Sequence, residues 1–386
     1  MRPRFFFLAL CAGLLLPLAG CQKVGFLPYA RELEDMALIR TMGVDTAPGG
    51  GVTVTISTGA GSGERSGTPV LLSGTAGTIS GACLDMQGRG SSYIYYGHVG
   101  QLLLGEDLAR QDARPALEYV LRDVEIRLNA DLYLVRGTGA ETAIRDAAGA
   151  DTGEEQESGE EESEDSGGDE KNSAAKRLEA MEDDAGLLSH TMSRTVGDIL
   201  ERLERTGSAF VPAVIQGGQG ELEAAGYGIL KDGVLVGWTG EDAANGINLA
   251  LGQVDADVLE LDGAAVRVVG ARTGVRPIFD GDKLTGLSIL CKVDANLAEA
   301  PPGMNLQDSA ALEHLEQELA QQELARIQAA LSLSRTLDAD FLELQLAAAL
   351  SAPSRKAEIA AQWSLSGLAF DTTVEARILR GYDMNE

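Results

Sequence analysis

Apolar residues recur along the chain with two periods, one typical of strands and the other typical of helices. Val52, Val54 and Ile56 alternate with polar residues, which predicts a strand with one buried face. The segment 227–238 shows the same alternation around an Asp-Gly pair typical of tight turns, and it predicts a β-hairpin. Comparable patterns predict strands at 69–72, 91–104, 128–135, 208–215, 258–261, 265–269 and 284–293, and helices at 29–39, 75–87, 113–121, 191–204 and 241–251.

The longest helical pattern begins near Asp308, a residue suited to an N-cap, and continues to about Arg335. Its apolar residues form one stripe that continues after a phase shift, so we expect a broad or drifting apolar face. A broad apolar face suits an interface, which makes this helix one candidate for partner contacts. The stripe consists of Leu312, Leu315 and Leu319, followed by Leu324, Ile327 and Leu331.

Strands and helices alternate along most of the chain, which predicts a mixed α/β or α+β fold. The composition changes at 151–170, which holds eleven acidic residues, no cation and no large apolar side chain. Such a segment cannot bury enough apolar surface to become ordered, so we expect a disordered linker or insertion. The predicted organisation is three domains of mixed sheets and helices: a signal peptide at 1–20, an N-terminal α/β domain at 21–147, the acidic linker at 148–185, a middle domain at 186–255 and a C-terminal α/β domain with the long helix at 256–386.

The N-terminus has the pattern of a lipoprotein signal peptide. Arg2 and Arg4 precede an apolar run at 5–18, and a Leu-Ala-Gly-Cys sequence similar to a bacterial lipobox ends at Cys21. The run is shorter than the roughly 20 apolar residues that a membrane-spanning helix needs. We therefore expect export, cleavage before Cys21 and lipidation of Cys21, which would anchor the protein in the bilayer. The alternative is ordinary secretory cleavage with Cys21 incidental.

The chain is strongly acidic, with 31 Lys and Arg against 59 Asp and Glu and a formal net charge of -28. Removal of Arg2 and Arg4 with the signal peptide changes this charge to -30, and omitting the eleven acids of 151–170 still leaves -19. Nucleic-acid binding depends on clustered cations, so this composition excludes it. The same acidity disfavours docking of the folded surface on anionic lipids, so membrane attachment must come from the acyl anchor.

Catalytic and metal-binding patterns are not found in the sequence. His98, His190 and His314 are scattered, and neither His-Glu-x-x-His nor Cys-x-x-Cys spacing occurs. The glycine run at 61–67 lacks phosphate-binding spacing and predicts a flexible turn, and no Gly-x-Ser-x-Gly nucleophile elbow is present. We therefore expect no enzyme activity, no cofactor and no metal.

After the signal peptide and Cys21, only Cys83 and Cys291 remain for the fold, which excludes a disulfide framework. Alternation over 287–293 places Cys291 on the apolar face of a strand, which favours a buried thiol. A Cys83–Cys291 disulfide remains as an alternative.

The densest charge cluster outside the acidic tract is formed by Arg122, Asp123, Glu125 and Arg127, between a predicted helix and a predicted strand. Loops at such positions often carry function, so this cluster is a candidate partner contact. The other interpretation is a structural ion-pair network within the fold.

Several of these segments, in this order, resemble the Ger(x)C family of spore germination lipoproteins. The most specific is Leu-Arg-Asp-Val-Glu-Ile-Arg-Leu-Asn at 121–129. Two features depart from the family pattern: the acidic insertion, and the lack of a Trp-Asp pair after the lipid-bearing cysteine. The other matching segments are 31–37, 43–45, 96–98, 102–108, 236–241, 272–277, 337–341 and Trp363.

The resemblance implies the C subunit of a GerA-type germinant receptor with three mixed α/β domains. It implies assembly with A-type and B-type membrane-spanning subunits on the extracytoplasmic face of the spore inner membrane, a role in nutrient-triggered germination and no catalytic activity. A lipid-anchored solute-binding protein of an importer is the alternative function, because an acyl anchor and alternating helices and strands also occur there.

Overall fold

The computed structural model describes most of the chain in eight segments. Cys21, the acidic tract 151–170, His190 and Asp308 lie outside them, so the signal peptide, the lipidation, the tract and the N-cap stay predictions. Among the helices of the described segments, none has the length and apolar character to cross a membrane. The described segments are 36–58, 70–90, 92–149, 174–183, 192–218, 221–254, 257–300 and 309–379.

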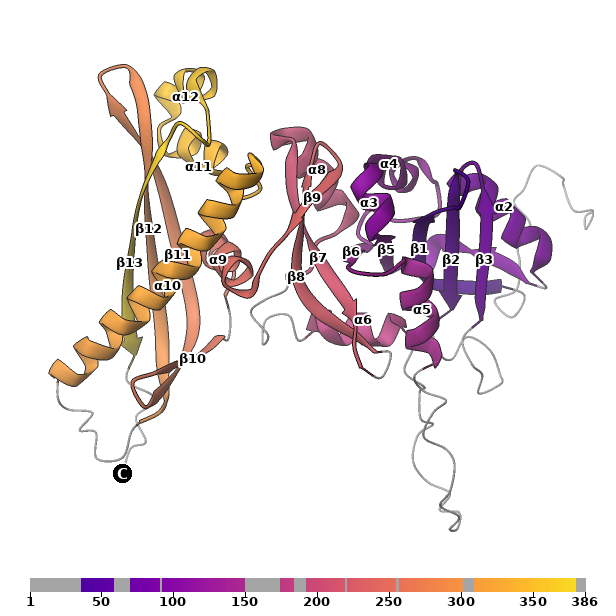
Figure 1. Cartoon of the computed structure of the whole chain (residues 1–386), viewed down its shortest axis with the longest axis horizontal. Helices are drawn as coiled ribbons and strands as arrows, with labels where there is room; N and C mark the ends of the chain where they lie inside the picture. The colour runs from indigo at the N-terminus through magenta and orange to yellow at the C-terminus, as the bar shows by residue number, and fades with distance from the viewer. Residues whose placement is uncertain are drawn as a thin grey trace, which may run out of the picture. The chain divides into compact units, whose positions relative to one another are not determined.

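Nine strands of the described segments form one mixed sheet in the order β3-β2-β1-β5-β6-β7-β8-β9, with β4 paired to β1 (Figure 1). The strands β1, β5, β6 and β7 are parallel in the middle, and antiparallel pairs flank them on both sides. These strands are β1 (Met36–Thr46), β2 (Val52–Thr58), β3 (Leu71–Ala76), β4 (Tyr93–Tyr95), β5 (Gln101–Gly105), β6 (Asp131–Val135), β7 (Ser208–Gln216), β8 (Leu222–Lys231) and β9 (Val234–Trp238).

Helices cover both faces of the parallel strands, as parallel sheets require. Leu102 and Leu104 of β5 pack into a core with α2, α3, α4 and α8, whereas Leu103 packs on the opposite face with α5 and α6. Side chains alternate between the faces of a strand, so an unbroken leucine run fits a strand buried on both sides. The helices are α2 (Ile79–Arg89), α3 (Glu106–Asp112), α4 (Arg114–Arg122), α5 (Ala140–Gly149), α6 (Ala174–Asp183) and α8 (Val196–Thr206).

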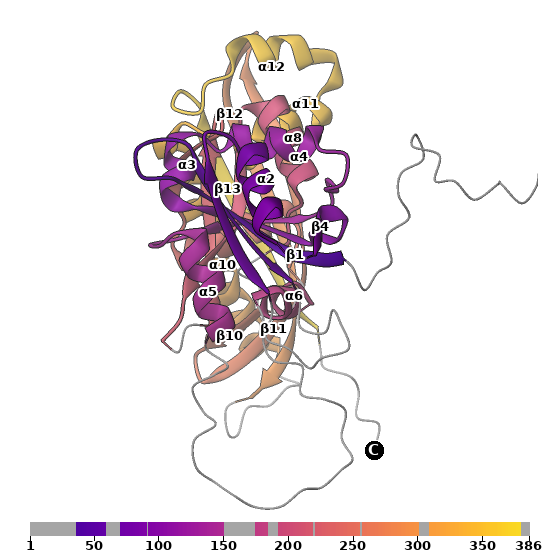
Figure 2. The same cartoon turned by 90° about the vertical axis from the view of Figure 1, so that its right-hand side faces the viewer.

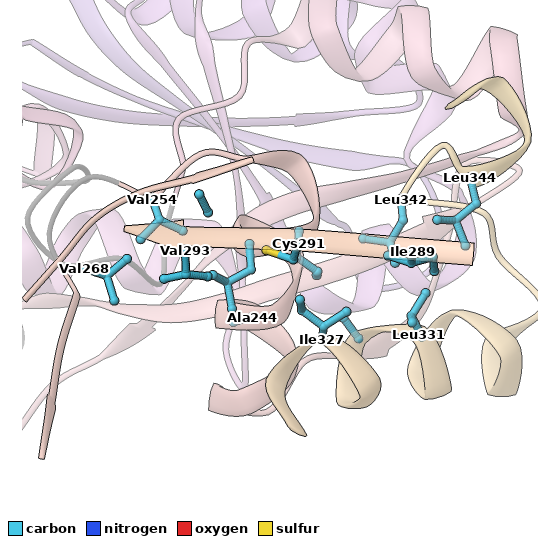
Figure 3. Close-up of a cluster of buried hydrophobic side chains, with 14 of the residues drawn as sticks. Ala244, Val254, Val268, Ile289, Cys291, Val293, Ile327, Leu331, Leu342 and Leu344 are labelled. Atoms are coloured by element: carbon cyan, nitrogen blue, oxygen red, sulfur yellow. The ribbon is translucent and has the colours of Figure 1, made fainter. Parts of the chain in front are cut away.

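The second sheet has the order β10-β11-β12-β13, antiparallel except for the parallel pair β12–β13. In Figures 1 and 2 the long helix α10 follows this sheet, and α11 and α12 lie at the β11–β12 hairpin end. Figure 3 shows Cys291 between Ile289 and Val293 on β12, with Ile327 and Leu331 of α10 nearby. The elements are α9 (Glu241–Leu251), β10 (Asp257–Leu261), β11 (Ala264–Asp280), β12 (Lys283–Glu299), α10 (Ser309–Leu337), α11 (Leu344–Ser351), α12 (Lys356–Gln362) and β13 (Ala369–Leu379).

The structure confirms the mixed α/β fold and many predicted elements, including the strand at 52–57, the 227–238 hairpin and the helix at 241–251. The predicted helix at 29–39 is wrong in its described part, because residues from Met36 onward form β1. Pairing with β2 and β5 outweighs the local apolar spacing. The predicted strand at 91–104 is interrupted by a 3-10 turn at Tyr96–His98.

Gly43 does not end a helix as its position after 29–39 predicts, but lies inside β1 where α5 packs on the sheet. A Cβ atom at Gly43 would lie 2.7 Å from Ile144 Cδ1 and 3.0 Å from Ala140 Cβ. Glycine therefore allows the helix to approach the strand this closely, and a larger residue would displace the Ile144 side chain.

The predicted N-terminal and middle domains contribute strands to one sheet. β6 pairs with β7 in parallel through Leu134 opposite Ala213 and Val135 opposite Val214. The domain boundaries as units of folding stay predictions.

Both cysteines of the fold are free and buried, and they belong to different hydrophobic cores. The alternative of a Cys83–Cys291 disulfide is therefore wrong. Burial raises the pKa of Cys83, and it raises the pKa of Cys291 to about 11. Both thiols are thus protonated at neutral pH and unreactive.

Candidate functional site

The candidate loop at 122–127 begins where α4 ends, and its own side chain Asp123 shapes it. The Asp123 amide donates a hydrogen bond to the Tyr119 carbonyl at 2.9 Å. Its carboxylate oxygen Oδ1 accepts hydrogen bonds from the amides of Glu125 at 2.8 Å and Ile126 at 3.1 Å. This is an Asx turn, in which the aspartate replaces a backbone acceptor and stabilises the chain reversal.

Glu125 attaches the same loop to the neighbouring strand and 3-10 turn. Its oxygen Oε1 accepts a hydrogen bond from the Tyr93 hydroxyl at 3.0 Å, and Oε2 accepts one from the Tyr96 amide at 3.1 Å. The next residue, Ile126, is buried in the core beneath. The loop is therefore held at its centre by two polar contacts and one apolar contact.

The two arginines of the cluster face solvent instead. Arg122 forms an ion pair with Glu118 at 2.8 Å, but 75% of its side-chain surface stays exposed. Arg127 is also exposed. The cluster thus divides: Asp123 and Glu125 have structural roles, whereas Arg122 and Arg127 are available for partner contacts.

Three apolar side chains beside these arginines are also exposed, which sequence reasoning missed. Leu121 is 53% exposed, Leu128 is 40% exposed and Val124 is 98% exposed. Helix phase could have indicated Leu121, since the buried residues of α4 are Ala116, Leu117 and Val120. Single exposed apolar residues are common, but three of them within eight residues of the chain, on and beside one fixed loop with two cations, are a candidate contact surface. We call Leu121, Arg122, Val124, Arg127 and Leu128 the loop patch.

A groove of about 820 Å³ lies next to the loop patch. Arg122 and Asp123 line it, together with Tyr119 of α4 and with Thr78 and Ile79 at the start of α2. The loop patch therefore meets the groove at Arg122.

In other segments that carry the family resemblance, carboxylate side chains form hydrogen bonds that connect one element to another. Asp45 at the end of β1 accepts hydrogen bonds from the amides of Ala140 at 2.8 Å and Glu141 at 2.7 Å, at the start of α5. Burial raises the pKa of Asp45. Gly105 leaves room for this carboxylate, since a Cβ atom there would lie 1.9 Å from Asp45 Oδ1.

Two further carboxylates have similar roles. Glu106 accepts hydrogen bonds from the Trp238 indole at 3.3 Å and from the Gly137 amide at 2.7 Å. Asp340 accepts hydrogen bonds from the amides of Leu344 at 2.8 Å and Gln345 at 3.0 Å, and so caps α11. Burial raises the pKa of Asp340 to about 6.

The histidines do not form a reactive cluster in the described part of the chain. His98 is exposed and contacts the Tyr95 ring edge-on, and His314 is exposed on α10, 3.7 Å from Asp262. His190 lies outside the described residues. In the segments that the structure describes, no three His, Cys, Asp or Glu side chains are arranged to hold a metal ion.

The apolar face of the long helix α10 is used inside the chain. Its buried residues include Leu315, Leu319, Ile327 and Leu331 at four-residue spacing, and the position between Leu319 and Ile327 is the buried Glu323. The apolar pattern is therefore interrupted because an acidic residue, Glu323, occupies one position of a continuous buried stripe. A partner could contact only the polar side of α10.

With this geometry established, the comparisons identify the fold. A crystal structure of the GerBC protein aligns with 92% of this chain and 98% of its own, with a TM-score of 0.55 and 17% sequence identity. The chain therefore has the fold of a GerBC-like protein. No curated protein has a significant sequence match to it.

Two family models match the sequence in order. The spore germination protein N-terminal domain matches residues 29–151, and the spore germination B3/GerAC-like C-terminal domain matches residues 225–381. The chain belongs to the GerAC family of spore germination proteins. The N-terminal match contains the loop patch.

Proposed function

We propose that the chain is the C-type subunit of a nutrient germinant receptor, lipid-anchored on the extracytoplasmic face of the spore inner membrane. It acts there by assembling with A-type and B-type membrane-spanning subunits. The observation that carries this proposal is that both GerAC domain models match the chain in order, one after the other.

The N-terminal sequence supports the anchor. Positive residues, a short apolar run and the Leu-Ala-Gly-Cys sequence ending at Cys21 are the features that direct lipidation of an exported protein. A diacylglyceryl group carries two acyl chains, which anchor stably where a single chain binds only marginally. The net charge of -28 makes such an anchor necessary, because the folded surface is repelled by anionic lipids.

The loop patch supports assembly through protein contacts. Its fixed backbone presents apolar and cationic side chains without a large loss of conformational entropy on binding. The subunit works by binding rather than by catalysis. In keeping with this, Asp45 and Asp340, whose pKa values are raised by burial, cap helices, and the two buried thiols are protonated.

Gene deletion with complementation tests this proposal. Spores without the gene should lose nutrient-triggered germination, measured as the fall in optical density after nutrient addition. The wild-type gene should restore it, whereas Cys21→Ala should leave the protein in the soluble fraction and restore little. A variant of a cysteine inside the fold, Cys83→Ser, is the control for general cysteine loss and should stay membrane-bound.

Two results would contradict the proposal. Unchanged germination in the deletion strain, when no paralogue is present, would remove the receptor role. Retention of Cys21→Ala protein in the membrane fraction, in the absence of the other subunits, would remove the acyl anchor.

A further inference from the structure

The four-stranded sheet has one face packed on helices and one face open to solvent. Thr273 and Val275 of β11 stand opposite Cys291 and Ile289 of β12, and these side chains face the core. Alternate residues point the other way, and Arg272 is exposed between them. Half-solvated antiparallel sheets are common, so exposure alone indicates nothing about function.

The register of the strands places charged side chains next to one another on the open face. Arg272 of β11 lies opposite Lys292 of β12, which lies opposite Glu375 of β13. In the neighbouring row, Asp294 lies opposite Arg377. The remaining charged positions of these rows are Arg276 in the row with Ser288 and Asp371, and Arg267 opposite Asn296.

The central rows of this face have the opposite charge sign to the rest of the chain. They hold five cations and three carboxylates, a local balance of +2 on a chain of -28. Toward the ends of the strands, Glu260 and Glu299 both lie opposite Ala265, and Asp280 lies opposite Lys283, so the positive balance is confined to the central rows. We call Arg267, Arg272, Arg276, Lys292 and Arg377 the cationic sheet face.

Most of these cations have no ion-pair partner among the described residues. Lys292 pairs with Glu375 at 2.8 Å, whereas none of the four arginines has a carboxylate of the described residues within 4.0 Å. Arginines elsewhere, such as Arg110 and Arg145, form ion pairs. Like charges directly opposite on a sheet are destabilising, and Arg272 faces Lys292 in this way. The arrangement therefore opposes stability of the isolated subunit and leaves guanidinium groups free to pair with other molecules.

We infer that the cationic sheet face is a docking surface for the acidic surface of a partner protein. Guanidinium groups bind carboxylates with paired hydrogen bonds. A bilayer is a poorer partner, because Asp294, Asp371 and Glu375 interleave with the cations and would be repelled by a uniformly anionic surface. A protein can match such a mixed pattern position by position. A second copy packed face to face would bring the same cations opposite one another, and this arrangement is disfavoured for that reason.

This inference rests on the proposed function in one respect, because the partner is sought among the membrane-spanning receptor subunits. The experiment co-expresses those subunits with the full-length chain and measures how much of them co-purifies. The test variant is Arg272→Glu/Arg276→Glu/Arg377→Glu. The control is Arg89→Glu/Arg145→Glu/Lys356→Glu, which changes the net charge equally at exposed positions outside this sheet and also breaks the ion pairs of Arg89 with Asp85 and of Arg145 with Glu141. Circular dichroism and thermal unfolding establish that both variants are folded.

The amount of partner that co-purifies with the test variant should be lower than with the wild type by about tenfold or more. The control variant should co-purify nearly as much as the wild type. Binding of the wild type should also weaken at about 1 M salt, where the Debye length is about 3 Å. Equal co-purification of the folded test variant and the wild type would overturn the inference and leave the proposed function intact. Failure of the wild type itself to co-purify would instead count against the proposed function.

Two further measurements separate other occupants of this face. Sedimentation of the wild type and test variant with phosphatidylglycerol vesicles tests the bilayer, and analytical ultracentrifugation tests self-association. A loss confined to vesicle binding, or confined to self-association, would overturn the inference. A loss confined to subunit co-purification supports it.

Discussion

Glu323 is an acidic residue that is buried among apolar side chains. It lies on the buried stripe of α10 with 0% of its surface exposed, and its oxygen Oε2 is 3.3 Å from Arg326 Nη1. Arg326 also pairs with Asp257, so one guanidinium serves two carboxylates, and Glu323 Oε1 has no hydrogen-bond partner among the described residues. Burial raises the pKa of Glu323 from 4.5 to about 7, with Arg326 opposing and Asp257 adding to the rise. Cys291 is also nearby, but its thiol is protonated.

This raised pKa predicts a specific pH dependence of stability. Between pH 4.5 and 7 the folded state holds a proton on Glu323 that the unfolded chain releases, so the free energy of unfolding falls as pH rises through this window. The loss is on the order of 3 kcal/mol by pH 8. Urea unfolding at pH 5 to 8 measures the free energy of unfolding of the wild type and of Glu323→Gln. As the pH rises, this free energy should fall more in the wild type than in the variant. The pKa of Asp340 is also raised, but Asp340 titrates in both proteins, so its contribution cancels in the difference between their free energies of unfolding. Parallel pH curves would contradict the prediction.

At the scale of elements, the contact between α9 and α10 depends on Gly246. A Cβ atom at this position would lie 2.0 Å from the carbonyl oxygen of Arg326, which is backbone and cannot move aside. The glycine is therefore required by helix approach, although glycine within a helix ordinarily lowers stability.

Replacing a glycine within a helix by alanine ordinarily raises the free energy of unfolding, but at this site it should lower it. Gly246→Ala should lower the free energy of unfolding by about 1–3 kcal/mol, because overpacking outweighs the gain in helix propensity. Gly88→Ala in α2 is the matched control, since a Cβ atom there has nothing within 4 Å, and it should raise stability by up to about 1 kcal/mol. Denaturant unfolding measures both. A stabilised Gly246→Ala protein would show that the helices do not approach this closely.

In the 122–127 loop, some residues stabilise the fold and others are available for partner contacts. Substitutions of the two kinds should therefore affect different properties, stability in one case and co-purification in the other. Asp123→Ala removes the acceptor for two amides and should cost about 1–2 kcal/mol of stability. Val124→Asp, at a side chain 98% exposed, should leave stability within about 0.5 kcal/mol but weaken co-purification with the membrane-spanning subunits.

Leu350→Asp, at an apolar side chain 70% exposed on α11, is the control for adding a charge at an exposed apolar site. Thermal unfolding and co-purification together check these expectations. Unchanged co-purification of folded Val124→Asp protein would exclude the loop patch as a contact.

At the scale of the whole molecule, charge is unevenly distributed. The net charge of -28 keeps the chain soluble and opposes non-specific binding to anionic surfaces. Against this background, Arg127 of the loop patch and the four arginines of the cationic sheet face have no carboxylate of the described residues within 4.0 Å, whereas Arg122 and Lys292 are paired. Electrostatic attraction at such places speeds encounter with acidic partners and selects their orientation. The acyl anchor at Cys21 and the two surfaces therefore have different proposed tasks, the first retention at the membrane and the others orientation.

Sequence reasoning predicted local elements well where the pattern alone decides them. The 227–238 hairpin follows from alternation around an Asp-Gly turn, and α9 matches its predicted bounds of 241–251. It failed at 36–39, the described end of the helix predicted at 29–39, where the apolar spacing suits a helix but these residues belong to β1, which pairs with β2 and β5. In the candidate loop it identified the four charged residues, but not which of them face solvent, because the partners Tyr93 and Tyr96 are distant in the sequence.

By itself, the sequence determined the mixed α/β class, the acidity of the chain and the family resemblance, since these depend on composition, periodicity and motif order. Only the tertiary structure decided that β6 and β7 join two predicted domains in one sheet, and that Glu323 completes the buried stripe of α10. It also decided that the cations of β11, β12 and β13 share one open face. The physical reason is that strand register and helix packing bring together residues far apart in the chain, and no local pattern specifies which residues become neighbours.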